Sequence, residues 1–213
     1  MNEKKMIKAV SVYVVRCKPH NVIKEDEFLK GIISVGWPCI GDLTGMSKKE
    51  IEPIFNAAWV GQGPIRLTQL YNFITMPVGS IVITPSVYNR DVHLFVTTSG
   101  YYYNKDQDIA NNHVVGTSKG NPHQIRAKFI ITVPREAFST KLQESLNAAK
   151  RTVTNFSSYI PEIEAIINNE PLKSMESPNI YRDEAIETLA KLLKSEDENI
   201  RLQAAINLLK AKE

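Results

Sequence analysis

Hydrophobic and polar positions alternate in short runs through the middle of the chain, a pattern typical of β-strands. The clearest example is the segment 71–103, where an apolar run at 81–83 and an alternating run at 92–96 are separated by turn residues. Three tyrosines at 101–103 end the strand that the second run predicts. Similar patterns predict strands at 7–16, at the start of 31–46, at 113–117 and at 125–134. The sequence therefore predicts a β-rich body with a central hairpin.

Apolar residues recur at helical spacing elsewhere in the chain. This spacing predicts helices over 25–30, after Ser47, over 67–76, over 136–146 and over 152–167. Ser47 and Glu50 match a capping box, and the glycine- and proline-rich run at 61–64 is expected to end that helix. Pro161 is expected in the first turn of a second helix within 152–167.

The last part of the chain has a different character. Residues 168–180 combine prolines, serines and asparagines with little periodicity, which is typical of a linker. Residues 181–213 predict two helices joined by a turn at 195–199, and this pair resembles a single HEAT-like unit. One such unit cannot bury a core alone, so we expect it to dock on the body or to self-associate into a homo-oligomer. The expected organisation is a body over 1–167, a linker over 168–180 and a helical hairpin over 181–213.

Composition is that of an ordinary globular protein. The chain has 213 residues, 43% of them hydrophobic, and a net charge of +3, so the overall charge does not indicate nucleic acid. The segment 115–151 is more basic, with seven Lys and Arg against two Glu. Within it, Arg126 and Lys128 lie two residues apart and share one face of a strand, where they are candidates to hold phosphate.

The cysteines and the hydropathy of the chain indicate the cellular compartment expected for the protein. The two cysteines, Cys17 and Cys39, match no metal-binding spacing and are read as buried, reduced thiols. The first residues are charged and the apolar run that follows is too short for a secretory signal. No stretch approaches the roughly 18–20 apolar residues of a membrane helix. These features predict a cytoplasmic protein without a membrane partner.

Catalytic signatures are lacking in the sequence. It contains no HExxH, GxSxG, P-loop or paired-cysteine zinc pattern. His113 and His123 flank a turn but have no evident third ligand, and His93 lies in an apolar strand, where a satisfied, partly buried histidine is the expected outcome. We therefore expect no enzymatic activity and no cofactor, with a metal-dependent hydrolase as a third alternative.

Aromatic residues give the positive indication of binding. In the run 101–103, Tyr101 and Tyr103 share one strand face and Tyr102 takes the other. One face is expected in the core, and the other is free to stack on a base, although packing alone would also account for all three. Trp37 has the same two interpretations, as a core residue under a loop or as a stacking surface at a pocket mouth.

The order of these features resembles the PUA/EVE-like barrels attached to nucleases in restriction systems. The segment Ile-Ser-Val-Gly-Trp leads to Gly41-Asp42-Leu43, and an aromatic segment precedes the strand that starts at Gly79. A strand ending in Gly-Tyr-Tyr-Tyr follows, and then the basic strand at 126–134. The likeness covers residues 7–165. It departs at Ser80, where an acid is common, and after His113.

The resemblance implies an α+β fold: a small PUA/EVE-like β-barrel with flanking helices, followed here by the C-terminal hairpin. It also implies non-catalytic binding of a nucleotide or of a modified or flipped base, in a restriction or anti-phage defence context. Stacking is then expected from Trp37, Phe73, Tyr101 and Tyr103; base-edge contacts from Asp42, Thr75, Ser86 and Thr97; and phosphate contacts from Arg126 and Lys128. The alternative is an assembly protein that uses its helical hairpin and takes no small ligand.

Overall fold

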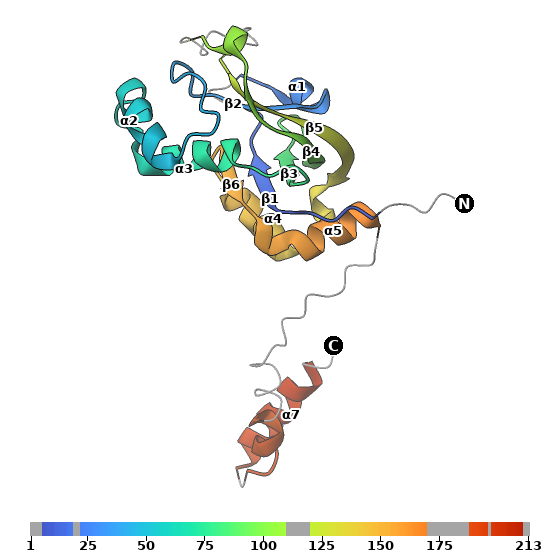
Figure 1. The fold of residues 1–213 in the computed structure, drawn as a ribbon. Helices are drawn as coiled ribbons and strands as arrows, with labels where there is room; N and C mark the ends of the chain where they lie inside the picture. Colours follow the sequence, from blue (N-terminus) through green and yellow to red (C-terminus); the bar gives the residue numbers. More distant parts are fainter. Residues whose placement is uncertain (1–5, 19–21, 110–119, 170–187, 196, 211–213) are drawn as a thin grey trace, which may run out of the picture. The chain divides into compact units, whose positions relative to one another are not determined.

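The computed structural model describes residues 6–18, 22–109, 120–169, 188–195 and 197–210. The chain divides into two compact units, Met1–Pro171 and Leu172–Glu213. The first unit carries a six-stranded sheet curled into a half-barrel with helices against it (Figure 1). This confirms the predicted mixed α+β class. No described helix has the length and hydropathy needed to cross a membrane.

The sheet has the strand order β2-β5-β4-β3-β1-β6. Strands β1 and β3 are parallel, and the other neighbours are antiparallel. The strands are β1 Val12–Val15, β2 Ile32–Val35, β3 Ile81–Pro85, β4 Asp91–Tyr103, β5 His123–Pro134 and β6 Val153–Asn155.

Helices pack on both faces of this sheet. One hydrophobic cluster joins it to α1 (Glu25–Leu29), α2 (Lys48–Ala58) and α3 (Gly63–Ile74). The other joins it to α4 (Thr140–Ala148) and α5 (Ile160–Asn168), which run below the sheet in Figure 1. Because Val82 belongs to the first cluster while Ile81 and Ile83 belong to the second, β3 is apolar without alternation. Short 3-10 turns cover Lys105–Gln107, Arg135–Ala137 and Ser157–Tyr159.

The central hairpin is longer and less regular than its sequence pattern indicates. β4 runs for 13 residues and pairs with β5 through two irregularities. At the second, β4 places three residues between Thr97 and Tyr101, while β5 places only Arg126 between their partners. The Ser99 hydroxyl accepts from the Arg126 N–H at 2.9 Å, which satisfies the displaced backbone donor. This bulge shifts the pairing register just before the tyrosines.

Two predicted helix boundaries are wrong. The run at 61–64 follows the end of α2 but also starts the next helix, because α3 begins at Gly63. Pro64 lies in the first turn of α3, where its missing N–H leaves no hydrogen bond unmade. Residues 153–155 form β6 rather than a helix, paired with β1 and tied to α3 by the Gln69 carboxamide, which accepts from the Thr152 N–H at 2.8 Å. Pro161 does occupy the first turn of α5, as predicted.

Other expectations fall partly or wholly beyond the described residues. The strand predicted at 113–117 and His113 lie outside them, as does the predicted linker from residue 170 on. In the second unit, residues 188–192 are helical and α7 spans Glu198–Lys210.

Candidate functional site

A hollow of about 500 Å³ opens on the first unit between the loop at 43–47, the end of α3 and strand β4. Pockets that take small ligands commonly measure about 300–1,000 Å³. Its lining combines apolar, aromatic and hydroxyl-bearing side chains: Leu43, Thr44, Gly45, Met46, Ser47, Tyr71, Ile74, Thr75 and Tyr101. This hollow is the candidate site.

The loop that forms one wall is shaped by local backbone chemistry. Gly41 and Gly45 have φ angles of 74° and 76°, a conformation that favours glycine. Between them, the Asp42 carboxylate accepts from the N–H and the hydroxyl of Thr44, at 3.0 and 2.7 Å. The Glu50 carboxylate then accepts from the Ser47 N–H at 2.8 Å, so the predicted capping box is present and starts α2 beside the hollow.

Tyr101 fixes the loop to the sheet. Its hydroxyl accepts from the Leu43 N–H at 3.3 Å and lies 3.0 Å from Nδ1 of His123. On the other side of that ring, Nε2 lies 3.2 Å from the carbonyl oxygen of Trp37. Because a carbonyl only accepts, Nε2 carries the proton and Nδ1 accepts from the Tyr101 hydroxyl. The chain of bonds therefore fixes one tautomer of His123.

Burial keeps this network neutral. His123 is fully buried, and loss of solvent lowers its pKa to about 4 despite the bond to the Trp37 carbonyl. Burial also raises the pKa of Tyr101 well above its ordinary value. Near neutral pH, this wall of the hollow therefore presents an uncharged phenol, which is backed by an uncharged, fully buried imidazole.

A strained loop lies behind the network. Trp37 and Cys39 have φ angles of 62° and 68°, which cost non-glycine residues energy. The loop is held by an indole N–H of Trp59, 2.9 Å from the Pro38 carbonyl, and by the Asp108 carboxylate, which accepts from the Cys39 N–H at 2.6 Å.

The Asp108 carboxylate also accepts from the Tyr103 hydroxyl. Burial, followed by this carboxylate, raises the pKa of Tyr103 to about 12. Tyr103 thus serves the loop at 37–39 rather than the hollow itself. Backbone strain of this kind is held only where the surroundings dictate it, and it concentrates at functional sites.

Of the ten residues predicted from sequence, two line the hollow, Thr75 and Tyr101. Asp42 and Tyr103 do not line the hollow. Asp42 bonds to Thr44 of the lining, and Tyr103 bonds to Asp108. Trp37 and Phe73 are core residues, with Trp37 packed against Phe55 at 6.4 Å between ring centroids. The core interpretation of Trp37 is therefore the one that the structure supports.

Ser86 and Thr97 make structural bonds away from the hollow. The Ser86 hydroxyl donates to the Glu25 carboxylate at 2.7 Å. The Thr97 hydroxyl donates to the Pro77 carbonyl at 2.9 Å and accepts from the Ser80 N–H at 3.0 Å, where it is almost fully buried. Their hydroxyl groups are occupied within the fold.

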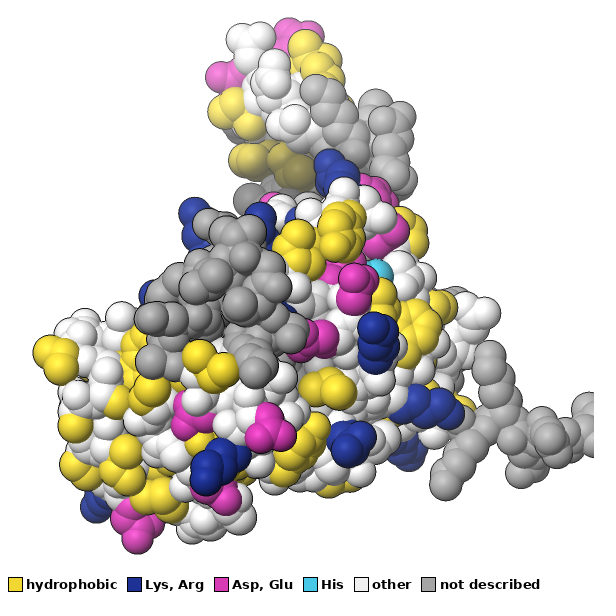
Figure 2. All heavy atoms as spheres, turned by 90° about the horizontal axis from the view of Figure 1, so that it is seen from above, with side chains coloured by type: hydrophobic (Ala, Val, Ile, Leu, Met, Phe, Trp, Pro, Cys, Tyr) yellow, Lys and Arg dark blue, Asp and Glu magenta, His cyan; other side chains and the backbone are white. Residues whose placement is uncertain are grey.

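Arg126 and Lys128 are exposed and alternate along β5 with Ile125 and Ala127, which pack in the first hydrophobic cluster. They therefore project from the other face of the strand and do not line the hollow. The Arg126 guanidinium sits 5.6 Å from the centre of the Tyr102 ring. On the face drawn in Figure 2, Lys and Arg side chains are spread among Asp and Glu side chains.

The sequence does not predict that the loop at 43–47 and Tyr71 line the hollow. Gly41 and Gly45 were the available signal, because two glycines flanking an Asp-x-Thr turn indicate a tight, backbone-rich loop. The contact between this loop and Tyr101 joins Leu43 to a residue 58 positions later in the chain, so no local pattern reveals it.

A second polar cluster lies buried around Glu25. Its carboxylate accepts from the Val87 N–H at 2.7 Å and lies 2.8 Å from Nε2 of His93, whose Nδ1 meets the Thr132 hydroxyl at 2.8 Å. Burial acts to raise the pKa of Glu25, but bonds from Val87, His93 and Ser86 outweigh it, and the pKa is lowered. The prediction that His93 is a satisfied histidine is confirmed, and the residue is buried more deeply than the partial burial expected.

The cysteine beside this cluster is not an activated nucleophile. The Cys17 thiol lies 3.8 Å from the Glu25 carboxylate, and burial raises its pKa to about 12, followed by the effect of that carboxylate. A thiol that stays protonated is a poor nucleophile. Among the residues described, no group of three or more His, Cys, Asp or Glu side chains is placed to hold a metal ion.

Comparison with known proteins gives no match to any protein-family model and none to a curated sequence. The resemblance to PUA/EVE-like barrels stays a prediction.

Proposed function

We propose that the first unit binds a nucleotide, or an extruded nucleic-acid base, in the hollow between the loop at 43–47, α3 and β4. The observation that carries this proposal is the presence of two tyrosines, Tyr71 and Tyr101, in the lining of a hollow of about 500 Å³. A base offers a π-face for stacking, and such contacts contribute roughly 1–3 kcal/mol per base. The PUA/EVE-like resemblance points the same way.

The polar rim favours one kind of base edge. The Thr44 hydroxyl gives its proton to Asp42, and the Thr75 hydroxyl gives its proton to the Tyr71 carbonyl, both at 2.7 Å. Their remaining lone pairs only accept hydrogen bonds. The exposed Asp42 carboxylate, beside the lining, also only accepts. A base whose edge carries an amino group, such as adenine or cytosine, supplies matching donors.

The test compares nucleotides that differ at this edge. Isothermal titration of AMP against IMP, and of CMP against UMP, is expected to show roughly three- to tenfold tighter binding of the amino-bearing member, the equivalent of about one hydrogen bond. Single-stranded oligonucleotides with the same bases test the extruded-base form. No binding to any of these ligands would overturn the proposal.

A matched pair of variants locates the binding. Tyr71→Leu removes a stacking face while keeping an apolar side chain, and it is expected to weaken binding roughly 10- to 100-fold. Tyr88→Leu makes the same change at an exposed tyrosine that does not line the hollow, and it should leave affinity unchanged. Equal effects of the two substitutions would contradict the assignment.

A further inference from the structure

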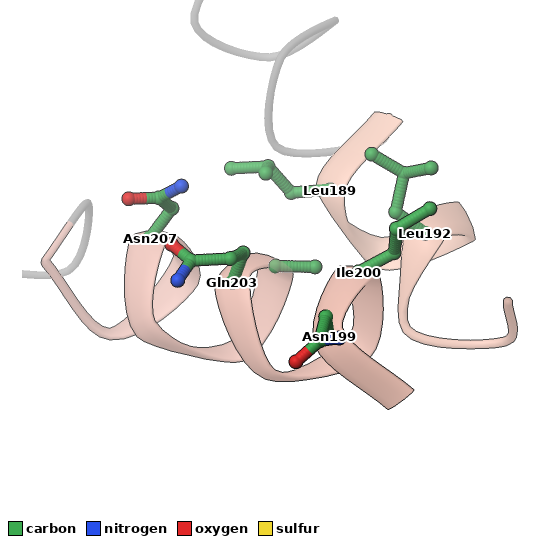
Figure 3. Close-up of a pocket in the computed structure, with 7 residues that line it drawn as sticks. Leu189, Leu192, Asn199, Ile200, Gln203 and Asn207 are labelled. Atoms are coloured by element: carbon green, nitrogen blue, oxygen red, sulfur yellow. The ribbon is translucent and has the colours of Figure 1, made fainter. Parts of the chain in front are cut away.

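Among the described residues, those that line the hollow proposed to hold a base carry no charge. The exposed Asp42 carboxylate beside the lining repels a phosphate, and Arg126 and Lys128 project from the other face of their strand. A second hollow, of about 260 Å³, lies in the second unit, but it is smaller than most ligand pockets and its described lining is apolar and carboxamide (Figure 3). A nucleotide in the first hollow therefore needs a cation from just outside the lining.

Lys48 is the first residue of α2 and directly follows Ser47, which lines the hollow. Its ammonium group donates to the hydroxyl of Thr68 on α3 at 2.8 Å. That hydroxyl gives its own proton to the Pro64 carbonyl, also at 2.8 Å, so its oxygen can accept from Lys48. The bond holds the long side chain in place, and a side chain held in advance loses less freedom when it binds a ligand.

The ammonium group of Lys48 keeps the capacity for a further partner. It has three N–H donors, and Thr68 takes one of them. Within the parts of the chain that the structure describes, no carboxylate forms an ion pair with Lys48, although Glu52 lies one turn further along α2. A half-buried cation with two donors therefore lies beside the hollow.

The bond to Thr68 places Lys48 toward one end of the hollow. Thr68 precedes Tyr71 by three residues and Thr75 by seven, so the three share one face of α3. A helix rises about 1.5 Å per residue, which puts Thr68 about 4–5 Å from Tyr71 and about 10 Å from Thr75 along the axis. Tyr71 and Thr75 both line the hollow. A base on Tyr71 can therefore present its edge to Thr75 and its phosphate to Lys48.

Nearby carboxylates limit the negative charge that this end of the hollow can accept. The Ser47 hydroxyl and N–H both donate to Glu50 and lower its pKa, so this carboxylate is ionised near neutral pH. Asp42 and Lys49 are exposed. One held ammonium group near two carboxylates suits a single phosphate better than a chain of three, because each added phosphate meets like charge.

We propose that Lys48 binds the phosphate of a nucleoside monophosphate whose base occupies the hollow. The inference rests on the proposed function, because it assigns a second contact to the same ligand. The two remaining N–H groups of Lys48 supply charge-assisted hydrogen bonds to phosphate oxygens, which are stronger than bonds between neutral groups. Lys48 then has the role that the sequence pattern assigned to Arg126 and Lys128.

The test compares AMP with adenosine by isothermal titration of the full chain. The wild type is expected to bind AMP roughly 10- to 100-fold more tightly than adenosine, the effect of hydrogen bonds to one charged group, and ATP no more tightly than AMP. Lys48→Met removes the ammonium group and keeps an unbranched side chain. It is expected to bring the affinity for AMP down to that for adenosine while leaving adenosine binding unchanged. Lys48→Arg keeps the charge and should retain part of the preference.

Lys49→Met is the matched control, because it makes the same change in net charge at the exposed neighbouring position. It should keep the preference for AMP. Equal affinity of the wild type for AMP and adenosine, or an equal loss of the preference in both Met variants, would overturn the role of Lys48 and leave base binding in the hollow standing. Markedly tighter binding of ATP would contradict the single-phosphate class. No binding of either AMP or adenosine would overturn the proposed function and this inference together.

Discussion

Two buried histidines of the same sheet, His123 and His93, belong to polar networks with opposite characters. His123 bonds to a carbonyl and a phenol, both uncharged, at the back of an open hollow. His93 bonds to the carboxylate of Glu25 in a cluster that ties α1 to the loop before β4. Neutral partners leave no charge in the wall behind the hollow, whereas the carboxylate of Glu25 bonds to groups of two further segments of the fold.

Removing the Glu25 carboxylate should have the greatest effect of the changes considered. Glu25→Ala removes the acceptor for the Val87 N–H, the Ser86 hydroxyl and His93, and breaking a buried pair in this way costs about 3–5 kcal/mol. Urea unfolding should show this loss, whereas Glu52→Ala at an exposed position of α2 should change stability little. If Glu25→Ala lowered the free energy of unfolding by less than about 1 kcal/mol, the Glu25 network would not stabilise the fold as described.

The pH dependence of stability separates the networks further. The pKa of His123 is lowered to about 4 in the folded state, against about 6.5 unfolded, so the unfolded state binds the proton first as pH falls. Stability is therefore expected to fall by on the order of 3 kcal/mol between about pH 6.5 and pH 4. His123→Gln should flatten this slope, as measured by urea unfolding at a series of pH values.

The Glu25 network acts in a lower pH window. Because the folded pKa of Glu25 is lowered, its contribution is present above its unfolded pKa of about 4.3 and is lost as pH falls through the folded pKa. Glu25→Ala should therefore remove a contribution that is lost below about pH 5, whereas His123→Gln acts on the slope between about pH 5 and pH 6.5. If Glu25→Ala flattened the slope of stability against pH in that range, the titration would belong to the Glu25 network and not to His123.

Tyr101→Phe should have the mildest effect. This change removes only the hydroxyl that joins Leu43 to His123, and the hollow is open to water that can replace it in part. We expect a loss of about 1–2 kcal/mol, at the lower end of the cost of unsatisfied buried groups. Tyr102→Phe, on the opposite strand face, is the matched control for thermal unfolding, and an equal loss there would argue against the network.

The strands of the body are predicted well from the sequence because most of them have a distinct hydrophobic pattern. Val82 lies in an unbroken apolar run, and β5 alternates before becoming apolar. The prediction fails at β6, because Val153 and Phe156 pack in different clusters on opposite faces of the sheet while their spacing suits one face of a helix. Tertiary pairing with β1 decides that segment.

The candidate site was predicted only in part for a similar reason. Tyr101 and Thr75 follow from local aromatic and polar patterns, whereas the assignment of Trp37 and Phe73 depends on which face meets the core. The pattern does place Arg126 and Lys128 on a common strand face, but it does not reveal that this face is turned away from the hollow. No local sequence pattern marks Glu25, because its bonding partners Ser86 and His93 lie more than 60 positions away.

Amide chemical-shift mapping of the full chain during titration with AMP tests nucleotide binding in the hollow directly. We expect the amides of residues 43–47, Tyr71 and Tyr101 to shift with one common dissociation constant, while those of Val87 and His93 stay unchanged. Shifts centred on the Glu25 cluster, or no shifts at millimolar nucleotide, would contradict binding in the hollow.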